Sequence, residues 1–246
     1  MPSTHSPLTA VVLAGGLGTR LRSHVSQVPK PMAPLGDKPF LEYLFLYLRK
    51  QSIERIIISV GYLGEQIVEY FGESYVDTPL VYVSETTRLG TGGAIAGVIN
   101  ECKLPSQIFV LNGDTLFPVD LVSLKQTHDK ARADCSIAVF QSADTQRYAS
   151  IALQQDGRVL SFGDTSGKGT WANGGMYLFN TAALATLCNG KKPPFSLEQD
   201  LFPQMLTQQF LVHGFQSDAP FLDIGIPDDY LRGHHFVNQL ERHLYL

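Results

Sequence analysis

Segments typical of buried β-strands alternate with segments typical of helices through the first half of this 246-residue chain. The strand-like segments are short, apolar runs, as strands buried on both faces are. The helix-like segments carry apolar residues on one face. The expected strands are 8–13, 55–60, 80–83 and 107–111, and the expected helices are 39–50, 63–71 and 94–102. This alternation predicts a Rossmann-like α/β fold, with a mostly parallel mixed central sheet flanked by helices.

The second half of the chain departs from this alternation. Residues 151–153 and 159–162, joined through Asp156-Gly157, are typical of a β-hairpin. Further along we expect a strand at 175–179, a helix capped by Ser196 with Gln199, a strand at 221–224 and a helix from about Pro227. No linker or repeat separates the halves, so we expect one domain over 1–246.

The composition excludes several classes of protein. A net charge of −4 gives no general surface for nucleic acid, and no apolar run is long enough to span a membrane. The N-terminus lacks the basic residues of a secretory signal, so we expect a cytoplasmic location. The cysteines, Cys102, Cys135 and Cys188, are odd in number and widely spaced, which favours free thiols over disulfides or a metal site.

The strongest motif, LAGGLGTRLRSHVSQVPKPM, follows the first expected strand. Gly15, Gly16 and Gly18 stand where an open α/β sheet places its ligands, and glycines let backbone N–H groups approach a phosphate closely. The motif is not a P-loop, because no Gly-Lys-Ser/Thr follows. It is not a dinucleotide fingerprint, because Leu21 replaces the third glycine.

Positive charge accompanies these glycines. Thr19 and Arg20 supply a hydroxyl and a cation, and Lys30 between two prolines supplies a second cation. Arginine can grip terminal phosphates bidentately, and lysine acts as a point charge. A solvated glycine-rich turn is the alternative interpretation, but the combination of strand, glycines and cations favours a triphosphate-binding loop.

Two aspartates are candidates for binding Mg²⁺. Asp114 follows the expected strand 107–111, and Asp223 lies in the apolar segment FLDIG, where an unpaired carboxylate would be costly. Mg²⁺ commonly takes one or two carboxylates, with phosphates and water as its other ligands. A turn or cap role is the alternative for Asp114. Asp120 is interpreted as a helix cap.

Together these motifs resemble the sugar-1-phosphate nucleotidyltransferase family, over residues 9 to 230. The segments that carry the resemblance are GTRLRS, PKPMAP, KPFLEYL, LGTGGAI, LNGDT, NGGMYLF and DIGIPDDY. Ser23 and Val25 replace a proline and a threonine of the broad family's pattern. This departure matches a narrower group of guanylyltransferases that act on D-glycero-α-D-manno-heptose 1-phosphate.

The resemblance implies a reaction and a role for each motif. A nucleoside triphosphate, GTP in the narrower group, and a sugar 1-phosphate would give a nucleotide sugar and pyrophosphate, with residues of about 8–120 on the nucleotide side and about 121–230 on the sugar-phosphate side. Asp114 and Asp223 would jointly hold Mg²⁺. The implied nucleotide-binding residues are Leu13, Gly15, Gly16, Gly18, Thr19, Arg20 and Lys30, of which Arg20 and Lys30 are also the catalytic candidates.

The segment LGTGGAI is implied to lie over the nucleobase, which makes Gly90 and Thr91 base-side candidates. A plain turn and helix start is the alternative. Glu85 is our candidate for guanine recognition, because a carboxylate can accept from guanine N1–H and N2–H₂ together and adenine cannot satisfy it. The alternative is a surface glutamate.

On the sugar side, amide side chains suit hydroxyl groups because they both donate and accept hydrogen bonds. Relatives commonly carry Glu-Lys after the hairpin phenylalanine, whereas Phe162 is followed here by Gly-Asp-Thr, so Lys168 is the candidate cation. Structural asparagines and an exposed helix-start glutamate are the alternatives. The candidate sugar-phosphate residues are Asn112, Asn173, Gly174, Lys168 and Glu198.

Three other functions are weighed against this one. The first is a mannose or glucose 1-phosphate nucleotidyltransferase that uses another triphosphate. The second is a glycosyltransferase, but an Asp-x-Asp motif is missing after Leu111. The third is a non-catalytic regulatory subunit, which could have lost Lys30, Asp114 or Asp223. The sequence leaves the oligomeric state open, and a homo-oligomer is one of the states it allows.

Overall fold

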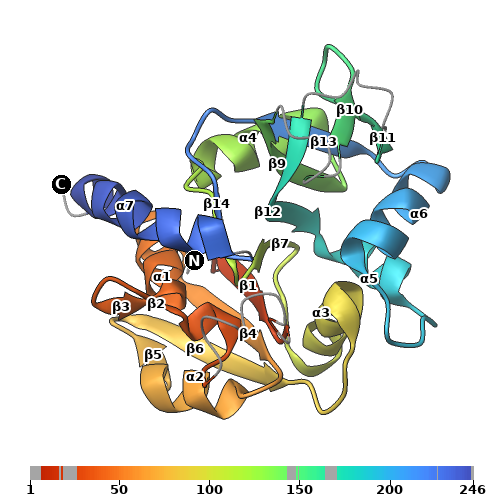
Figure 1. Ribbon diagram of the computed structural model, residues 1–246. Helices are drawn as coiled ribbons and strands as arrows, with labels where there is room; N and C mark the ends of the chain where they lie inside the picture. Colours follow the sequence, from red (N-terminus) through yellow and green to blue (C-terminus); the bar gives the residue numbers. More distant parts are fainter. Residues whose placement is uncertain are drawn as a thin grey trace, which may run out of the picture.

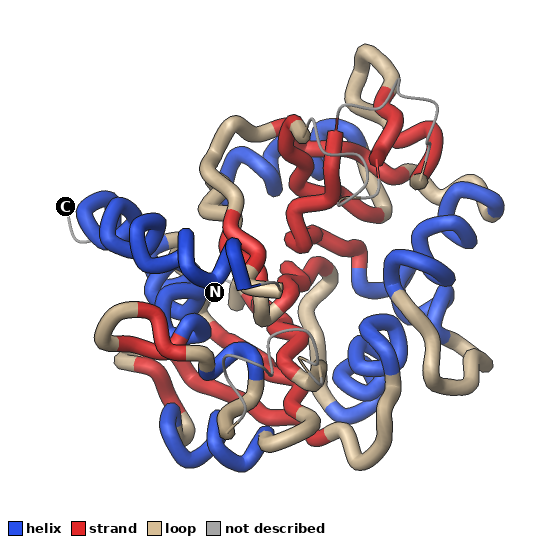
Figure 2. Tube along the Cα trace, viewed as in Figure 1, coloured by secondary structure: helices blue, strands red, loops and turns tan. Residues whose placement is uncertain are grey.

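A computed structural model describes residues 7–16, 18, 27–142, 148, 150–163, 171–225 and 227–244. Its main feature is a mixed sheet of ten strands, counted over these residues (Figure 1). The strands run through the middle of the molecule and helices lie to either side of them (Figure 2). The predicted fold class is therefore confirmed.

The N-terminal half supplies the parallel part of this sheet, in the order β7-β1-β4-β6. These strands are β1 (Thr9–Ala14), β4 (Arg55–Val60), β6 (Thr78–Ser84) and β7 (Gln107–Asn112). Strand β1 has β4 on one side and β7 on the other, so the chain reverses its direction of progress across the sheet at β1. The carboxyl ends of strands at such a switch point form the crevice where α/β sheets bind ligands.

The second half extends the sheet with antiparallel pairings. The long strand β12 (Trp171–Asn180) pairs antiparallel with β7 and with β9 (Cys135–Gln141), and its register against β9 shifts between Asn173 and Tyr177. The remaining strands of the sheet are β10 (Ser150–Leu153) and β11 (Val159–Phe162), which form the predicted hairpin, β13 (Val212–Gln216) beside β9, and β5 (Ser74–Tyr75) beside β6.

Two small strand pairs lie outside the main sheet. Strand β8 (Thr115–Leu116) pairs with β14 (Leu222–Asp223), and β2 (Pro34–Leu35) pairs with β3 (Lys38–Pro39). The helices are α1 (Phe40–Lys50), α2 (Gly64–Phe71), α3 (Gly90–Glu101), α4 (Leu121–Ala131), α5 (Thr181–Cys188), α6 (Phe202–Thr207) and α7 (Pro227–Leu244), with short turns η1 (Lys30–Met32) and η2 (Leu197–Leu201).

Both faces of the parallel strands are buried, and this explains why the strands lack polar alternation. On one face Val12 and Ile58 belong to the same buried cluster as Phe45 of α1. On the other face Val11, Ile57 and Val83 lie with Ile95 and Val98 of α3. Each fully buried aliphatic or aromatic side chain contributes roughly 1.5–3 kcal/mol. Burial on both faces therefore stabilises the strands whose carboxyl ends form the crevice.

Helix caps test two details of the sequence interpretation. The Asp120 side chain caps α4 by accepting from the N–H groups of Val122 and Ser123, as predicted. Ser196 also caps its helix as predicted, and its hydroxyl accepts from the N–H of the predicted partner Gln199 at 3.1 Å. The reciprocal bond of the capping box does not go to the Gln199 side chain. The Ser196 N–H donates to Asp200 instead, at 2.6 Å. The capping turn is a π-helix, whose wider spacing brings the fourth following residue into reach.

The sequence interpretation missed β9, β13 and α5, and it predicted only the cap of α4, Asp120. The free cysteines that it predicted are observed, with Cys135 and Cys188 buried. In the part of the chain with described coordinates, no helix has the length and apolarity required to cross a bilayer.

Candidate functional site

A cavity of about 760 Å³ opens at the carboxyl-terminal edge of β1, β4, β6 and β7. Its volume is within the range of small-molecule sites. Most of the predicted site residues share it. The predicted residues that line it are Leu13, Gly15, Gly16, Gly18, Lys30, Glu85, Gly90, Thr91, Asn112, Asp114 and Glu198.

The glycine loop lies against functional side chains on both flanks. A Cβ atom at Gly15 would collide with Glu85 Oε1. Gly18 has φ +57°, and a Cβ there would lie 2.8 Å from the Cβ of Lys30. Larger residues at these positions would displace Glu85 and Lys30. The loop is therefore held close to the residues with which it would share a ligand.

Lys30 lies between the two predicted metal ligands. Its Nζ atom donates to Asp114 Oδ2 at 2.5 Å and lies 3.7 Å from Asp223 Oδ1. The lysine side chain is 9% exposed, and the aspartates are 36% and 23% exposed. Both carboxylates therefore face one cation at the wall of the cavity.

The backbone fixes this pair of carboxylates. In the β8–β14 pair Asp223 is opposite Thr115, the residue after Asp114, and the Ile224 N–H donates to the Asp114 carbonyl at 3.1 Å. The Gly225 N–H donates to Asp223 Oδ1 at 2.6 Å. Two aspartates that are 109 positions apart in the sequence are thus brought together by a two-residue ladder.

These residues fit a hard divalent cation. Over the described ranges, no group of three or more His, Cys, Asp or Glu side chains is placed to hold a metal ion. Two converging carboxylates without a third protein ligand suit Mg²⁺, which completes its octahedron with phosphate oxygens and water. The Lys30 ammonium already shows that the pair accepts a positive charge.

Glu85 is the first residue after β6 and lines the same cavity. Ser59 of β4 donates to its Oε1 atom at 2.8 Å. Burial raises the pKa of Glu85, and the Ser59 hydroxyl and the Leu89 backbone N–H oppose that rise. Because its pKa is raised, Glu85 loses its charge at a higher pH than an exposed glutamate would.

Gly90 and Thr91 begin α3, and both line the cavity. Gly90 has φ +74°, and a Cβ there would collide with the Phe195 carbonyl oxygen. The Thr91 hydroxyl donates to Glu198 Oε2 at 2.8 Å and accepts from the Leu197 N–H at 2.8 Å. The base-side candidate Thr91 is therefore bonded directly to the sugar-side candidate Glu198.

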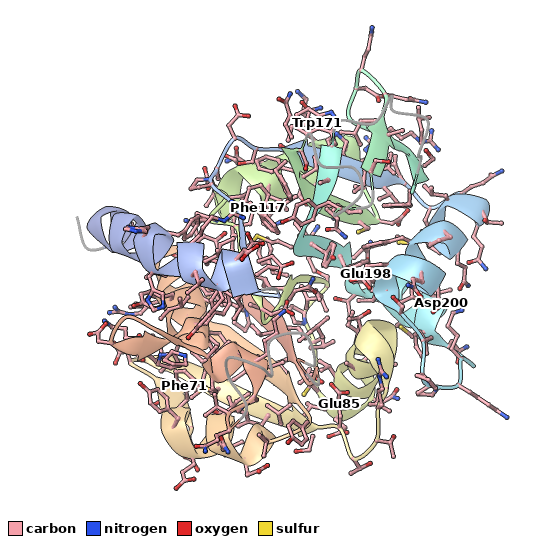
Figure 3. The ribbon with its side chains drawn as sticks, viewed as in Figure 1. Phe71, Glu85, Phe117, Trp171, Glu198 and Asp200 are labelled. Atoms are coloured by element: carbon pink, nitrogen blue, oxygen red, sulfur yellow. The ribbon has the colours of Figure 1, made fainter. Side chains whose placement is uncertain are left out.

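Two acidic residues of the cavity, Glu85 and Glu198, are labelled in Figure 3. Glu85 lies on the segment that leads into α3, and Glu198 lies on the turn before α6. The Ser196 hydroxyl also donates to Glu198 Oε2 at 2.8 Å, and the Tyr177 hydroxyl lies 3.5 Å from Oε1. These contacts hold Glu198 in place at the wall.

Asn112 ends β7 and leaves its Oδ1 atom buried and without a hydrogen-bond partner among the described residues. Buried polar atoms nearly always have a partner, so this oxygen is free to accept from a bound ligand. Asn173 and Gly174 do not line the cavity. Asn173 bonds Tyr177 and the Gly175 N–H, and Gly174 leaves room for the Phe117 ring.

Three predicted residues, Thr19, Arg20 and Lys168, lie outside the described residues. The structure also adds residues that the sequence interpretation missed. Tyr62, Arg88 and Gly225 line the cavity, and Ser59 holds Glu85. Tyr62 and Gly225 are each the second residue after a strand, and that position is the one signal that could have singled them out.

Comparisons with known proteins agree with this geometry. The profile of the family described as "Nucleotidyl transferase" matches residues 9–239. The D-glycero-α-D-manno-heptose 1-phosphate guanylyltransferase of Aneurinibacillus thermoaerophilus is 42% identical over 227 residues, 91% of this chain and 95% of that protein. The enzyme of the same name from Campylobacter jejuni is 39% identical over 94% of this chain and 99% of that protein.

A solved structure adds a direct view of a relative with a nucleotide analogue. HddC from Yersinia pseudotuberculosis, complexed with GMP-PN, is 31% identical and has a TM-score of 0.80, covering 94% of this chain and 99% of that one. The fold is therefore shared, over 94% of this chain, with a structure that is complexed with GMP-PN.

Proposed function

This chain belongs to the nucleotidyl transferase family, and from that premise we propose that it transfers the guanylyl group of GTP to D-glycero-α-D-manno-heptose 1-phosphate. The products are a GDP-heptose, a precursor for bacterial surface polysaccharide, and pyrophosphate. The observation that carries the proposal is the shared cavity, in which the glycine loop, Lys30 and the carboxylate of Asp114 converge.

A divalent metal ion is the general cofactor of such nucleotidyltransferases, and we propose Mg²⁺ for this chain. Asp114 and Asp223 would hold it. When bound, Mg²⁺ neutralises charge on the phosphates and on the departing pyrophosphate.

The proposed chemistry needs no general base, because the sugar phosphate already carries a nucleophilic oxygen at neutral pH. That oxygen attacks the α-phosphorus of GTP, the new P–O bond forms in line with the breaking one, and pyrophosphate leaves with the electron pair. Lys30 stabilises the charge at the α-phosphate, and the loop N–H groups and Arg20 hold the leaving group. Catalysis is then a matter of positioning and electrostatics.

In this proposal Glu85 recognises the base of the nucleotide and Glu198 recognises the sugar. Glu85 accepts from the guanine N1–H and N2–H₂, beside Gly90. Glu198 and Asn112 bind hydroxyl groups of the sugar. The Oδ1 atom of Asn112, which is buried and has no hydrogen-bond partner among the described residues, supports this role. Asn173, Gly174 and Lys168 remain proposed on the sugar-phosphate side through the resemblance alone.

The experiment is a panel of nucleoside triphosphates against sugar 1-phosphates, followed by pyrophosphate release. We expect GTP with the heptose 1-phosphate to give the highest kcat/KM. Faster turnover of mannose 1-phosphate or glucose 1-phosphate would reassign the sugar, and equal turnover of ATP would remove Glu85 from base selection.

The site also bears on partners and location. The proposed substrates are small phosphorylated molecules, so we propose neither a nucleic acid nor a membrane as partner. We propose a cytoplasmic location, where GTP is available. We keep the division into a nucleotide side, about 8–120, and a sugar-phosphate side, about 121–230, as part of the proposal.

A further inference from the structure

Ser59 is a buried hydroxyl in an otherwise apolar part of the sheet. The strand that contains it reads RIIISV, and the Ser59 side chain is fully buried. A buried hydroxyl is unfavourable unless it is hydrogen-bonded. Its described partner is the Glu85 carboxylate, at 2.8 Å from Ser59 Oγ to Oε1.

The sheet register makes this contact a fixed one. Strands β4 and β6 are parallel, and Ser59 is opposite Val83. Residues two apart on a strand share a face, so Glu85 extends on the same face as Val83 and Ser59. The Glu85 N–H donates to the Val60 carbonyl at 2.7 Å and continues the pairing by one residue beyond β6.

Two further groups confine the same carboxylate. The backbone of Gly15 lies so close to Oε1 that no side chain fits between them, and the Leu89 backbone N–H is hydrogen-bonded to it. A free glutamate side chain loses conformational entropy when a ligand fixes it. Glu85 is already oriented before the base arrives.

We propose that Ser59 is a positioning residue for base selection, which locks the Glu85 carboxylate in the orientation that accepts two N–H groups of guanine. The inference rests on the proposed function in one respect, that Glu85 receives the guanine base. Ser59 itself touches no substrate and acts through Glu85.

The test variant is Ser59→Ala, assayed with GTP and with ITP, whose base lacks the 2-amino group. We expect KM for GTP to rise roughly five- to tenfold, the scale of one typical intramolecular hydrogen bond. The preference for GTP over ITP should fall, while kcat with GTP and KM for the sugar phosphate stay unchanged, because only binding of the base is affected. The melting temperature should stay within about 5 °C of wild type.

The matched control is Ser136→Ala. Ser136 is also a fully buried strand serine, but its hydroxyl lies 2.9 Å from His128 Nδ1 and not at the cavity. We expect it to leave the kinetics with both nucleotides unchanged. A rise of KM for GTP in this control equal to that in Ser59→Ala would show a general packing effect and overturn the proposal.

A double-mutant cycle with Glu85→Ala separates the proposed role of Ser59 from the proposed role of Glu85 in binding guanine. If Ser59 acts through Glu85, Ser59→Ala should add nothing in the Glu85→Ala background. If Glu85→Ala loses the wild-type preference for GTP over ITP but Ser59→Ala keeps it, only the role of Ser59 is overturned. Equal use of GTP and ITP by the wild type overturns the base assignment of Glu85 and this inference with it.

Discussion

The ammonium group of Lys30 faces two carboxylates, those of Asp114 and Asp223. Replacing Lys30 by methionine keeps most of its apolar stem and removes the charge. We expect Lys30→Met to lower kcat by roughly 10²–10³, the usual loss when one preorganised group that stabilises a transition state is removed. Steady-state kinetics with saturating substrates measures this.

The control is Lys125→Met, which removes a lysine that pairs with Asp129 on α4, away from the cavity. It should leave kcat unchanged. An unchanged kcat in Lys30→Met would exclude Lys30 from the chemistry.

The two aspartates make a prediction that does not depend on turnover. Asp114→Asn and Asp223→Asn should each weaken binding of Mn²⁺, used as a spectroscopic probe for Mg²⁺ in the presence of GTP. The loss should be at least the roughly 10- to 100-fold seen when an outer-shell partner is removed. Asp120→Asn, which alters only the cap of α4, should bind Mn²⁺ as wild type does. Wild-type affinity in both site variants would rule out a shared metal site.

At this scale the sequence identifies residues whose chemistry is visible in a motif. Asp114 and Glu85 were predicted from their type and their place after a strand, and Lys30 was predicted as a cation between two prolines in the glycine-loop motif. The structure brings all three to one cavity. Ser59 could not be predicted, because one serine in an apolar strand gives no sign of which neighbour its hydroxyl meets. That depends on the β4–β6 register, which appears only in three dimensions.

At the start of α3 the nucleotide side of the cavity meets the sugar-phosphate side. The N–H groups of Gly92 and Gly93 donate to the Phe195 carbonyl at 3.0 and 3.3 Å, and so satisfy donors that a helix start leaves free. Glycine at position 90 is required by its positive φ and by the proximity of Phe195. The segment before η2 is thereby docked on the helix.

Two glycines of this helix make a matched pair for a stability test. We expect Gly90→Ala to lower the free energy of unfolding by about 1–3 kcal/mol, because it forces a side chain into a left-handed conformation and against the Phe195 carbonyl. Gly97→Ala should be neutral or stabilising by up to about 1 kcal/mol, since its Cβ would meet its nearest neighbour at 3.8 Å. Chemical denaturation measures both, and equal stability of the two variants would contradict the account.

Two of the elements that the sequence interpretation did not place, β13 and α4, have weak local patterns. Strand β13 includes His213 and Gly214 and is stabilised by pairing with β9, which no local propensity encodes. Helix α4 is largely polar and buries only Leu121, Leu124 and His128. Such elements depend on their tertiary partners, whereas the apolar runs of β1 and β4 can be recognised as strands from the local sequence.

Over the whole molecule, segments from both ends of the chain complete the cavity. Strand β14 returns to β8 and brings Asp223 to Asp114, and η2 brings Glu198 to Thr91. The α/β class follows from the alternating pattern. The proximity of Asp114 and Asp223 was expected only through the family resemblance, and the hydrogen bond between Thr91 and Glu198 was not expected.

The fold also carries a buried histidine that links stability to pH. His128 is 1% exposed, and its Nδ1 atom lies 2.9 Å from Ser136 Oγ. Burial lowers the pKa of His128 to about 4, against the opposing effect of Asp129 and Asp134, while Lys125 and His213 lower it further. In the unfolded chain the pKa returns to about 6.5.

Because the folded pKa lies below the unfolded one, the unfolded state takes up the proton first as the pH falls. This contribution to stability is complete above pH 6.5 and is lost between about pH 6.5 and pH 4, on the order of 3 kcal/mol. We expect His128→Gln to show a smaller decline than wild type over that window in urea denaturation. Parallel curves for the two proteins would contradict a buried neutral histidine.

The central claim is that one cavity joins the α-phosphorus of GTP to a sugar phosphate. The most direct measurement uses GTP labelled with ³²P at the α-phosphate or at the γ-phosphate, with D-glycero-α-D-manno-heptose 1-phosphate and Mg²⁺. We expect the α label to appear in the sugar nucleotide and the γ label in pyrophosphate, and we expect omission of the sugar phosphate to stop both. Release of γ label as inorganic phosphate, or of α label without sugar phosphate, would contradict the central claim.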